Sequence, residues 1–304
     1  MKIDALVRNN VKNISPYSSA RDDFKNEFDN KLIYLDANES PFDNLINRYP
    51  DNKHTELKKM VSDIKKVNVN QVIFGNGTDE IFDLIVRVFC NPYKDKIITL
   101  PPTYGMYDVI AKTNGVENIE IPLKSDFSID KNQILKLHST SMKVLFLCSP
   151  NNPTGNSFDT NNLTDLIKAF KGIVVIDEAY IDFSSKQSLI SLIEDNNNLI
   201  ITQTMSKAYG MAGIRLGMGF SSKKIIDYLN KIKPPYNINV LTEKKALEEL
   251  NKRGKALDMY QFALSKVNND SVITRMLNGK IEQLALYWMV DAEKILNDLK
   301  YIEA

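Results

Sequence analysis

The sequence predicts an α/β fold in which a mostly parallel central sheet is flanked by helices. Short, continuously apolar runs rich in β-branched residues recur along the chain, as expected for strands buried on both faces. Amphipathic helical stripes separate these runs, and such alternation favours a parallel sheet. The length of 304 residues is enough to bury one large core and a smaller second domain.

The composition argues against several classes of partner. Hydrophobic residues make up 43% and charged residues 25%, ordinary values for a globular protein. The formal net charge of +1 gives no reason to expect a nucleic-acid or anionic-membrane partner. No apolar run approaches the roughly 20 residues of a membrane span, and the N-terminus lacks a signal-peptide core. We therefore expect no nucleic acid, no membrane and a cytoplasmic location.

Cysteines and histidines give no metal or disulfide pattern. Cys90 and Cys148 form neither a disulfide framework nor a paired metal motif, and Cys148 lies in an apolar run where we expect it to be buried. His54 and His138 have no cysteine or carboxylate at ligand spacing, so no metal site is expected. His54 lies in a charged stretch and is expected to be solvated.

The chain divides into three parts. Residues 1–50 carry Pro16, Pro41 and Pro50 among polar residues, which predicts an irregular N-terminal arm. Residues 51–245 form the expected large domain. Its strands are expected at residues 72–74, 96–100, 144–147, 173–176 and 199–202.

Two helices of this large domain are indicated by their own signals. After the first strand, Thr78 is expected to cap a helix whose first turn carries Asp79 and Glu80, since acidic residues favour that end of the helix dipole. Residues 163–170 fit a crossover helix between two later strands.

The last part, residues 246–304, is expected to be mainly helical. No strand-like segment follows residue 245. From Gly279 onward, apolar residues recur at steps of three and four, which predicts one long amphipathic helix that reduces or replaces a small domain. Its apolar stripe consists of Ile281, Leu284, Trp288, Ala292, Ile295, Leu299 and Ile302.

Four segments carry residues suited to chemistry, and three of them follow expected strands. They are residues 149–155 (SPNNPTG), 177–180 (DEAY), 204–217 (TMSKAYGMAGIRLG) and 75–80 (GNGTDE). Open α/β sheets bind ligands at the carboxyl ends of their strands, so these segments are expected on one rim. Taken singly they have ordinary interpretations: a turn, a helix cap, a surface lysine and a tight strand-to-helix turn.

Together the four segments favour a phosphorylated heterocycle. A carboxylate such as Asp177 keeps a facing pyridine nitrogen protonated, which makes the ring an electron sink. Lys207 lies between hydroxyls and a glycine-rich stretch with Arg215, and hydroxyls, N–H groups and a guanidinium hold phosphates. A lysine beside such an anchor forms an imine with an aldehyde and moves protons. The helix start at residues 75–80 adds an anion site.

In order and spacing, these segments resemble those of the fold-type I aminotransferases, which depend on pyridoxal 5′-phosphate (PLP). Within that group the chain is most similar to the histidinol-phosphate aminotransferase family. Further matching motifs are residues 16–21 (PYSSAR), 35–41 (LDANESP), 47–51 (NRYPD) and 101–107 (PPTYGMY). The resemblance runs from about residue 8 to about residue 250.

The resemblance implies roles for particular residues. Lys207 would carry PLP as a Schiff base and act as acid and base, Asp177 would pair with the pyridine nitrogen, and Tyr180 would complete the catalytic set. Asn152 and Tyr180 would hydrogen-bond the phenolic oxygen of the ring, and Tyr104 would stack on its face. The implied phosphate ligands are Thr204, Ser206, Arg215 and the backbone N–H groups of Thr78, Asp79 and Glu80.

The resemblance also implies partners and a reaction. Tyr49 would reach the cofactor phosphate of a neighbouring subunit in a homodimer, and Tyr17 and Asn38 would lie near the substrate. The implied reaction is ping-pong amino transfer between histidinol phosphate and 2-oxoglutarate, which yields imidazole-acetol phosphate and glutamate in histidine biosynthesis. Packing is the alternative explanation for all three of Tyr17, Tyr49 and Tyr104.

The C-terminus departs from the family pattern, in which a C-terminal α/β domain supplies substrate-binding arginines. After Leu250 the only arginines are Arg253 and Arg275, and neither lies in the family's motif. Either the chain is truncated or frameshifted, or a shortened helical tail replaces the domain. Three functions therefore stay open: the family reaction, a related PLP enzyme such as an aromatic aminotransferase or phosphothreonine decarboxylase, and a PLP-binding form with little activity. A Rossmann nucleotide site is disfavoured because residues 75–77 lack the third glycine.

Overall fold

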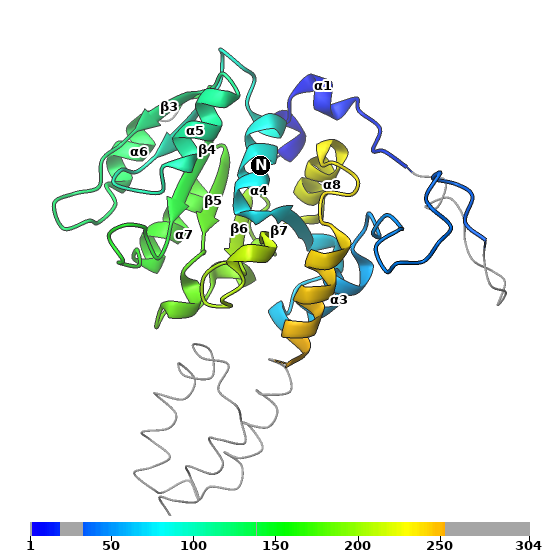
Figure 1. The fold of residues 1–304 in the computed structure, drawn as a ribbon. Coiled ribbons are helices and arrows are strands. Elements are labelled where there is room, and N and C mark those ends of the chain that lie inside the picture. Colours follow the sequence, from blue (N-terminus) through cyan, green and yellow to red (C-terminus); the bar gives the residue numbers. More distant parts are fainter. Residues whose placement is uncertain (1, 19–32, 138, 253–304) are drawn as a thin grey trace, which may run out of the picture.

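A single seven-stranded sheet forms the centre of the molecule (Figure 1), in a computed structural model that describes residues 2–18, 33–137 and 139–252. The strand order is β1-β7-β6-β5-β4-β2-β3. The strands are β1 (Val72–Asn76), β2 (Lys96–Thr99), β3 (Glu117–Glu120), β4 (Met142–Cys148), β5 (Ile173–Asp177), β6 (Leu199–Thr204) and β7 (Leu216–Ser221). Strand β7 is antiparallel to both neighbours and the other pairings are parallel, which confirms the mostly parallel sheet.

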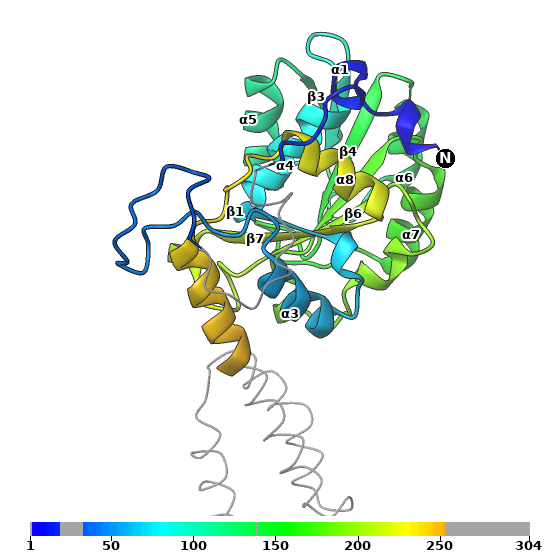
Figure 2. The same cartoon turned by 90° about the vertical axis from the view of Figure 1, so that its right-hand side faces the viewer.

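Helices cover both faces of this sheet (Figures 1 and 2). One face packs on α4 (Gly77–Phe89), α5 (Met106–Thr113), α8 (Lys223–Ile232) and the N-terminal η1 (Ile3–Ala5) and α1 (Asn9–Lys12). The other face packs on α3 (Thr55–Lys65), α6 (Lys131–Leu137), α7 (Thr160–Ala169), η4 (Leu189–Ile193) and a helix over residues 240–252. Three short 3-10 helices lie in connections: η2 (Val69–Gln71), η3 (Ile181–Phe183) and η5 (Ala212–Ile214).

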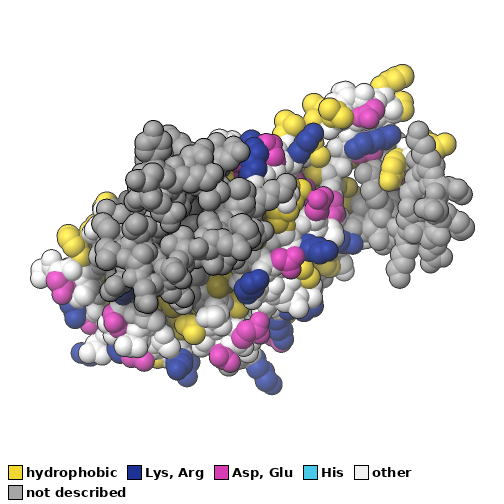
Figure 3. All heavy atoms as spheres, turned by 90° about the horizontal axis from the view of Figure 1, so that it is seen from below, with side chains coloured by type: hydrophobic (Ala, Val, Ile, Leu, Met, Phe, Trp, Pro, Cys, Tyr) yellow, Lys and Arg dark blue, Asp and Glu magenta, His cyan; other side chains and the backbone are white. Residues whose placement is uncertain are grey.

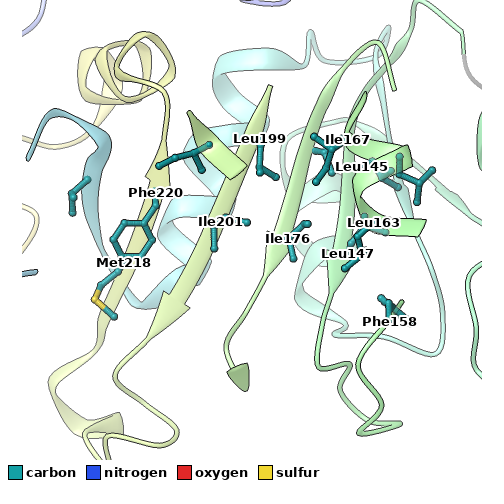
Figure 4. Packing of buried hydrophobic residues seen from close by; sticks show 14 of the residues in the cluster. Leu145, Leu147, Phe158, Leu163, Ile167, Ile176, Leu199, Ile201, Met218 and Phe220 are labelled. Carbon is teal, nitrogen blue, oxygen red and sulfur yellow. The ribbon is translucent and has the colours of Figure 1, made fainter. Parts of the chain in front are cut away.

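Alternation along each strand divides the core between these two layers. In β1, Val72 and Phe74 pack in one apolar cluster and Ile73 in the other. Figure 4 shows the layer that contains Phe74, where Leu145 and Ile176 lie beside side chains of α7 and Ile201 lies toward Phe220 of β7. Fully burying such a side chain contributes about 1.5–3 kcal/mol, so continuous apolar runs are what this sheet requires.

The five expected strands are confirmed, but β3 and β7 were not expected from the sequence. Strand β3 has the sequence ENIE with exposed ends, so it carries no apolar signal. Strand β7 contains Gly217 and Gly219, and glycine ordinarily weakens a strand. Gly217 is required by tertiary packing, because a Cβ there would lie 2.3 Å from the carbonyl carbon of Gly77.

The prediction that Thr78 caps α4 is wrong by two residues. The N-cap is Asn76, whose side chain makes no capping bond, and Gly77 begins the helix with φ +73°. Glycine allows this left-handed turn, so the helix starts directly after β1 and Thr78 is buried inside its first turn. Asp79 and Glu80 do lie in the first turn, as expected.

Two further expectations about burial have opposite outcomes. Cys148 is buried, as predicted, whereas His54 is 1% exposed and not solvated. The His54 ring lies 3.3 Å from Glu243 and 3.3 Å from Asn237, because the helix over residues 240–252 folds back across the start of α3. The sequence pattern around His54 is local and contains no signal of this distant helix.

The N-terminal arm is less irregular than expected. Ile3, Val7 and Val11 are buried in the core layer that contains α4 and α8. Asp4 accepts hydrogen bonds from Tyr228 at 2.7 Å and Lys224 at 2.5 Å, which fix this arm to α8. The predicted helix from Gly279 onward, the arginines Arg253 and Arg275, and His138 lie outside the described residues.

The described surface mixes the two signs of charge. Figure 3 shows acidic and basic side chains interspersed over the face seen from below, where grey atoms do not cover it. Within the described ranges, no helix is long and apolar enough to cross a bilayer. In the same ranges, no cluster of three or more His, Cys, Asp or Glu residues is arranged to hold a metal ion.

Candidate active site

A pocket opens at the edge of the sheet where the parallel strands end. Its lining residues come from the carboxyl ends of β4, β5 and β6 and from the segments that follow β1, β2, β4, β5 and β6. They are Gly77, Thr78, Asp79, Tyr104, Cys148, Asn152, Asp177, Ala179, Tyr180, Thr204, Ser206, Lys207 and Arg215. Strand register explains the convergence, because Cys148 pairs with Asp177 and Asp177 pairs with Thr202 across neighbouring strands.

Asp177 forms the floor of this pocket at the end of β5. Its carboxylate is buried and accepts three hydrogen bonds: from Tyr107 Oη at 2.7 Å, Thr202 Oγ1 at 3.1 Å and the Ala179 N–H at 3.2 Å. Burial raises the pKa of Asp177 to about 6 and the nearby Asp79 carboxylate adds to this rise, whereas the hydrogen bonds oppose it. The carboxylate is therefore ionised at neutral pH.

Lys207 also lines the pocket, from the turn after β6. Its side chain is exposed, and Nζ lies 5.4 Å from the centre of the Tyr180 ring, a cation–π distance. The N–H of Gly210 donates to the carbonyl of Lys207 at 2.9 Å and closes this turn. Asp177 and Lys207 therefore share one pocket, with a carboxylate at its base and an amine at its rim.

Backbone N–H groups, hydroxyls and a guanidinium gather at a third side of the pocket. The first turn of α4 meets the turn that carries Arg215, since the Gly77 N–H donates to the Arg215 carbonyl at 2.7 Å. Arg215 Nη2 lies 3.7 Å from Asp79 and would lie 2.7 Å from a Cβ on Gly77. The Thr204 hydroxyl accepts the Ser206 N–H at 3.1 Å. A helix N-terminus with these groups is a ready anion site.

Tyr104 is held between the anion site and the floor. Its hydroxyl donates to Asp79 Oδ1 at 3.1 Å, and its ring meets that of Tyr107 edge to face at 5.5 Å. Burial, together with the Asp79 charge, raises the pKa of Tyr104 to about 12, so the hydroxyl stays a neutral donor. The ring therefore has a fixed position on the wall of the pocket.

The donor set fits PLP. A carboxylate has about four acceptor positions, and the described residues fill three of those on Asp177, which leaves one for a protonated ring nitrogen. Asn152 and Tyr180 line the same pocket with groups that can hydrogen-bond a phenolic oxygen. The anion site suits the phosphate, and the amine of Lys207 suits the aldehyde.

Four expected site residues do not line this pocket. The Glu80 carboxylate turns away and accepts bonds from Asn76 and Asn237, although only its backbone N–H was assigned a role. The Tyr49 ring stacks on Tyr236 at 4.5 Å. Tyr17 is 61% exposed, and within one chain neither Tyr17 nor Asn38 is among the residues that line the pocket.

Sequence reasoning missed Tyr107 and Thr202, which both bind Asp177. Each could have been found by its spacing from an expected site residue. Tyr107 follows Tyr104 by three positions at the start of a helix, and Thr202 lies two positions before Thr204 on one strand face. The sequence alone gives no direction for either side chain.

Comparisons with known proteins identify the family of this chain. The family model of class I and II aminotransferases matches residues 36–266. The histidinol-phosphate aminotransferase of Flavobacterium psychrophilum is 54% identical over 268 residues, which cover 88% of this chain and 76% of that protein. The corresponding protein of Christiangramia forsetii is 47% identical over 299 residues, 98% of this chain and 84% of the relative. The similarity therefore continues past residue 250, where it was expected to end.

A solved structure shows the same fold at lower identity. The histidinol-phosphate aminotransferase of Sinorhizobium meliloti, in complex with pyridoxal-5′-phosphate, superposes with a TM-score of 0.62 at 21% identity. The alignment covers 70% of this chain and 62% of that one. At this identity the likeness supports the architecture, and the evidence for family membership comes from the sequence matches.

Proposed function

Since the chain belongs to the class I and II aminotransferases, a PLP-dependent family, and within them to the histidinol-phosphate aminotransferases, we propose that it transfers the amino group of histidinol phosphate to 2-oxoglutarate. The observation that carries the proposal is the single pocket shared by Asp177, Lys207 and an anion site. A buried carboxylate with a raised pKa that shares a pocket with an amine is typical of a functional site.

The residues of the pocket would divide the work of holding PLP. When bound, PLP supplies the electron sink that stabilises a carbanion at the reacting carbon. Thr204, Ser206, Arg215 and the first turn of α4 would bind its phosphate. Asn152 and Tyr180 would donate to its phenolic oxygen, and Tyr104 would stack against the ring.

Asp177 would hold the proton on the ring nitrogen. With a pKa of about 6 before PLP binds, its carboxylate is negative at pH 7 and attracts a pyridinium. The dry surroundings that raise this pKa also strengthen the attraction, since charges interact more strongly where water is excluded.

Lys207 would move the proton at the substrate carbon. Its position at the exposed rim gives substrate direct access to the amine, whose Nζ lies 5.4 Å from the centre of the Tyr180 ring. An amine that alternates between the two protonation states can take a proton from one carbon and return it to another.

The homodimer belongs to the same proposal. Tyr49 is 51% exposed and lies outside its own pocket, so the part of its ring that Tyr236 does not cover is accessible to a second copy. The same segment presents Ile33, Leu35, Phe42 and Leu45, each at least three-quarters exposed. Apolar side chains gathered in this way favour burial against another subunit.

The free, buried cysteines Cys90 and Cys148 are compatible with a reducing cytoplasm.

Cofactor trapping and turnover test the proposal together. PLP added to the purified chain should give an absorbance band, and borohydride should fix a pyridoxyl-phosphate mass on the peptide that contains Lys207. Lys207→Ala should lose this adduct with an unchanged circular dichroism spectrum, whereas the exposed Lys223→Ala should keep it. Glutamate should then form from histidinol phosphate and 2-oxoglutarate faster than from aromatic amino-acid donors.

Two results would contradict the proposal in different ways. Adduct formation without glutamate would reduce the function to PLP binding. Preferred turnover of an aromatic donor, or release of carbon dioxide from phosphothreonine, would move the chain to a related PLP enzyme. Absence of any adduct on Lys207 would reject the cofactor itself.

A further inference from the structure

Tyr107 lies beneath the pocket and is fully buried on α5. Its ring stacks on Phe146 at 4.8 Å with an interplanar angle of 15°, and meets Phe82 edge to face at 5.2 Å. These two rings, from β4 and α4, hold the Tyr107 ring in one orientation. Its hydroxyl reaches Asp177 Oδ2 at 2.7 Å, a short distance for such a bond.

The hydrogen bonds of Asp177 are divided unequally between its two oxygens. Oδ1 accepts from the Thr202 hydroxyl and the Ala179 N–H, which belong to the neighbouring strand and to the chain just beyond β5. Among the described residues, Oδ2 accepts from Tyr107 alone. Tyr107 therefore provides the one contact that fixes Oδ2, and Oδ2 keeps an acceptor position for a ligand.

Of the groups around Asp177, Tyr107 does most to counteract the rise in the Asp177 pKa that burial causes. Burial raises the pKa of Asp177, and the hydrogen bond from Tyr107 is the largest influence that lowers it. Burial also raises the pKa of Tyr107 well above its usual value, and that of Cys148 on β4 to about 12, so both stay neutral. Asp79 on α4 is a charged neighbour that acts against ionisation, and Tyr104 on the pocket wall is neutral.

We infer that Tyr107 is a positioning residue for the proposed reaction: its hydroxyl keeps the Asp177 carboxylate ionised and in one orientation toward the pocket. The inference rests on the proposed function, because it assigns a use to that carboxylate. Tyr107 itself does not line the pocket, so it acts through Asp177 and, by its ring, through Tyr104.

Tyr107→Phe removes the hydroxyl and keeps the stacked ring. One hydrogen bond to a charged group corresponds to about one pKa unit, so PLP affinity should fall about tenfold at pH 5 and about twofold at pH 7, where Asp177 with its pKa of about 6 is still largely ionised. PLP affinity measured against pH should reach half of its maximum at a pH about one unit higher than in the wild type, because Asp177 then ionises less readily. This pH is the half-point of PLP binding. The matched control is Tyr228→Phe, whose hydroxyl also donates to an aspartate at 2.7 Å but outside the pocket; its PLP binding should be unchanged.

Replacing Tyr107 with 3,5-difluorotyrosine strengthens the hydrogen bond to Asp177, whereas Tyr107→Phe removes it, and the side chain keeps almost the same shape. Its hydroxyl is a stronger donor, so the half-point of PLP binding should move to lower pH. In an Asp177→Asn background, neither Tyr107 replacement should move any half-point further. Equal half-points in the wild type, Tyr107→Phe and the fluorinated protein would overturn the inference.

A measurement without PLP separates this inference from the proposed function. The titration of the Asp177 carboxyl can be followed by carbon-13 NMR of aspartate-labelled protein and assigned with Asp177→Asn. The pKa should be higher in Tyr107→Phe than in the wild type. If the wild type binds no PLP, the proposed function falls while this titration still decides the role of Tyr107; an unchanged pKa would reject it.

Discussion

The side-chain amide of Asn237 donates to the Glu80 carboxylate at 3.0 Å, and so joins the segment after α8 to the first turn of α4. Asn237 also donates to the Phe74 carbonyl at 3.0 Å, and its own carbonyl accepts from the Asn76 side chain at 2.7 Å. Glu80 in turn accepts the Asn76 N–H at 2.5 Å. One residue thus braces the turn whose N–H groups form the anion site.

Asn237→Ala should loosen this turn. Several hydrogen bonds disappear, and the part-buried Glu80 carboxylate loses a donor, so stability should fall by about 1–3 kcal/mol. PLP affinity should fall severalfold, because the N–H groups of the turn are no longer held in place. Chemical denaturation and a PLP titration would measure both effects. The exposed Asn70→Ala serves as control, and equal losses in the two variants would refute the bracing role.

Gly217→Ala should separate β7 from the start of α4. A Cβ at this position would lie 2.3 Å from the Gly77 carbonyl carbon and 2.4 Å from the Thr78 nitrogen, which are backbone atoms with little room to shift. Overpacking of this kind costs about 1–3 kcal/mol, and the anion site should weaken with it. Thermal unfolding should show the loss. Gly105→Ala, with nothing within 4 Å of its Cβ, should be tolerated, and similar melting temperatures for both variants would contradict the proposed clash.

Arg215→Ala should act on the phosphate alone. The guanidinium lies over the first turn of α4, so its removal should lower PLP affinity about tenfold or more and leave affinity for pyridoxal, which has no phosphate, nearly unchanged. The ratio of the two affinities is the quantity to measure. Arg87→Ala, which breaks an exposed ion pair with Asp83, should leave that ratio as it is. An equal loss of affinity for PLP and for pyridoxal would show that Arg215 does not bind the phosphate.

Asp177 should make the PLP-free protein less stable as pH rises. Its folded pKa of about 6 lies above the unfolded value of 3.8, so the folded state keeps the proton longer. The stabilising contribution is complete below pH 3.8 and is lost as pH rises through 6, an effect of about 3 kcal/mol. Asp177→Asn should lack it, so the difference in unfolding free energy between wild type and variant should shrink or change sign between pH 4 and pH 7. Parallel pH profiles would show that Asp177 titrates normally.

The sequence by itself determined five strands of the sheet and the edge at which the pocket lies. Apolar runs such as residues 144–147 and 173–176 can be satisfied only by burial on both faces, and this requirement is local to each run. The polar motifs that follow these runs had to gather where parallel strands end. For the same reason the sequence predicts Asp177 and Lys207 on one rim.

The tertiary structure alone decided which side chains support that pocket. Tyr107 binds Asp177, which lies 70 residues later in the sequence, and His54 is buried against Glu243, which lies 189 residues later. No local sequence pattern encodes contacts over such separations. Strand β7 was not predicted because it contains glycines. At Gly217 a side chain would collide with the backbone of α4, which comes from a distant part of the chain. Burial periodicity is a property of neighbouring residues, whereas hydrogen bonds to a buried carboxylate depend on which elements the fold brings into contact.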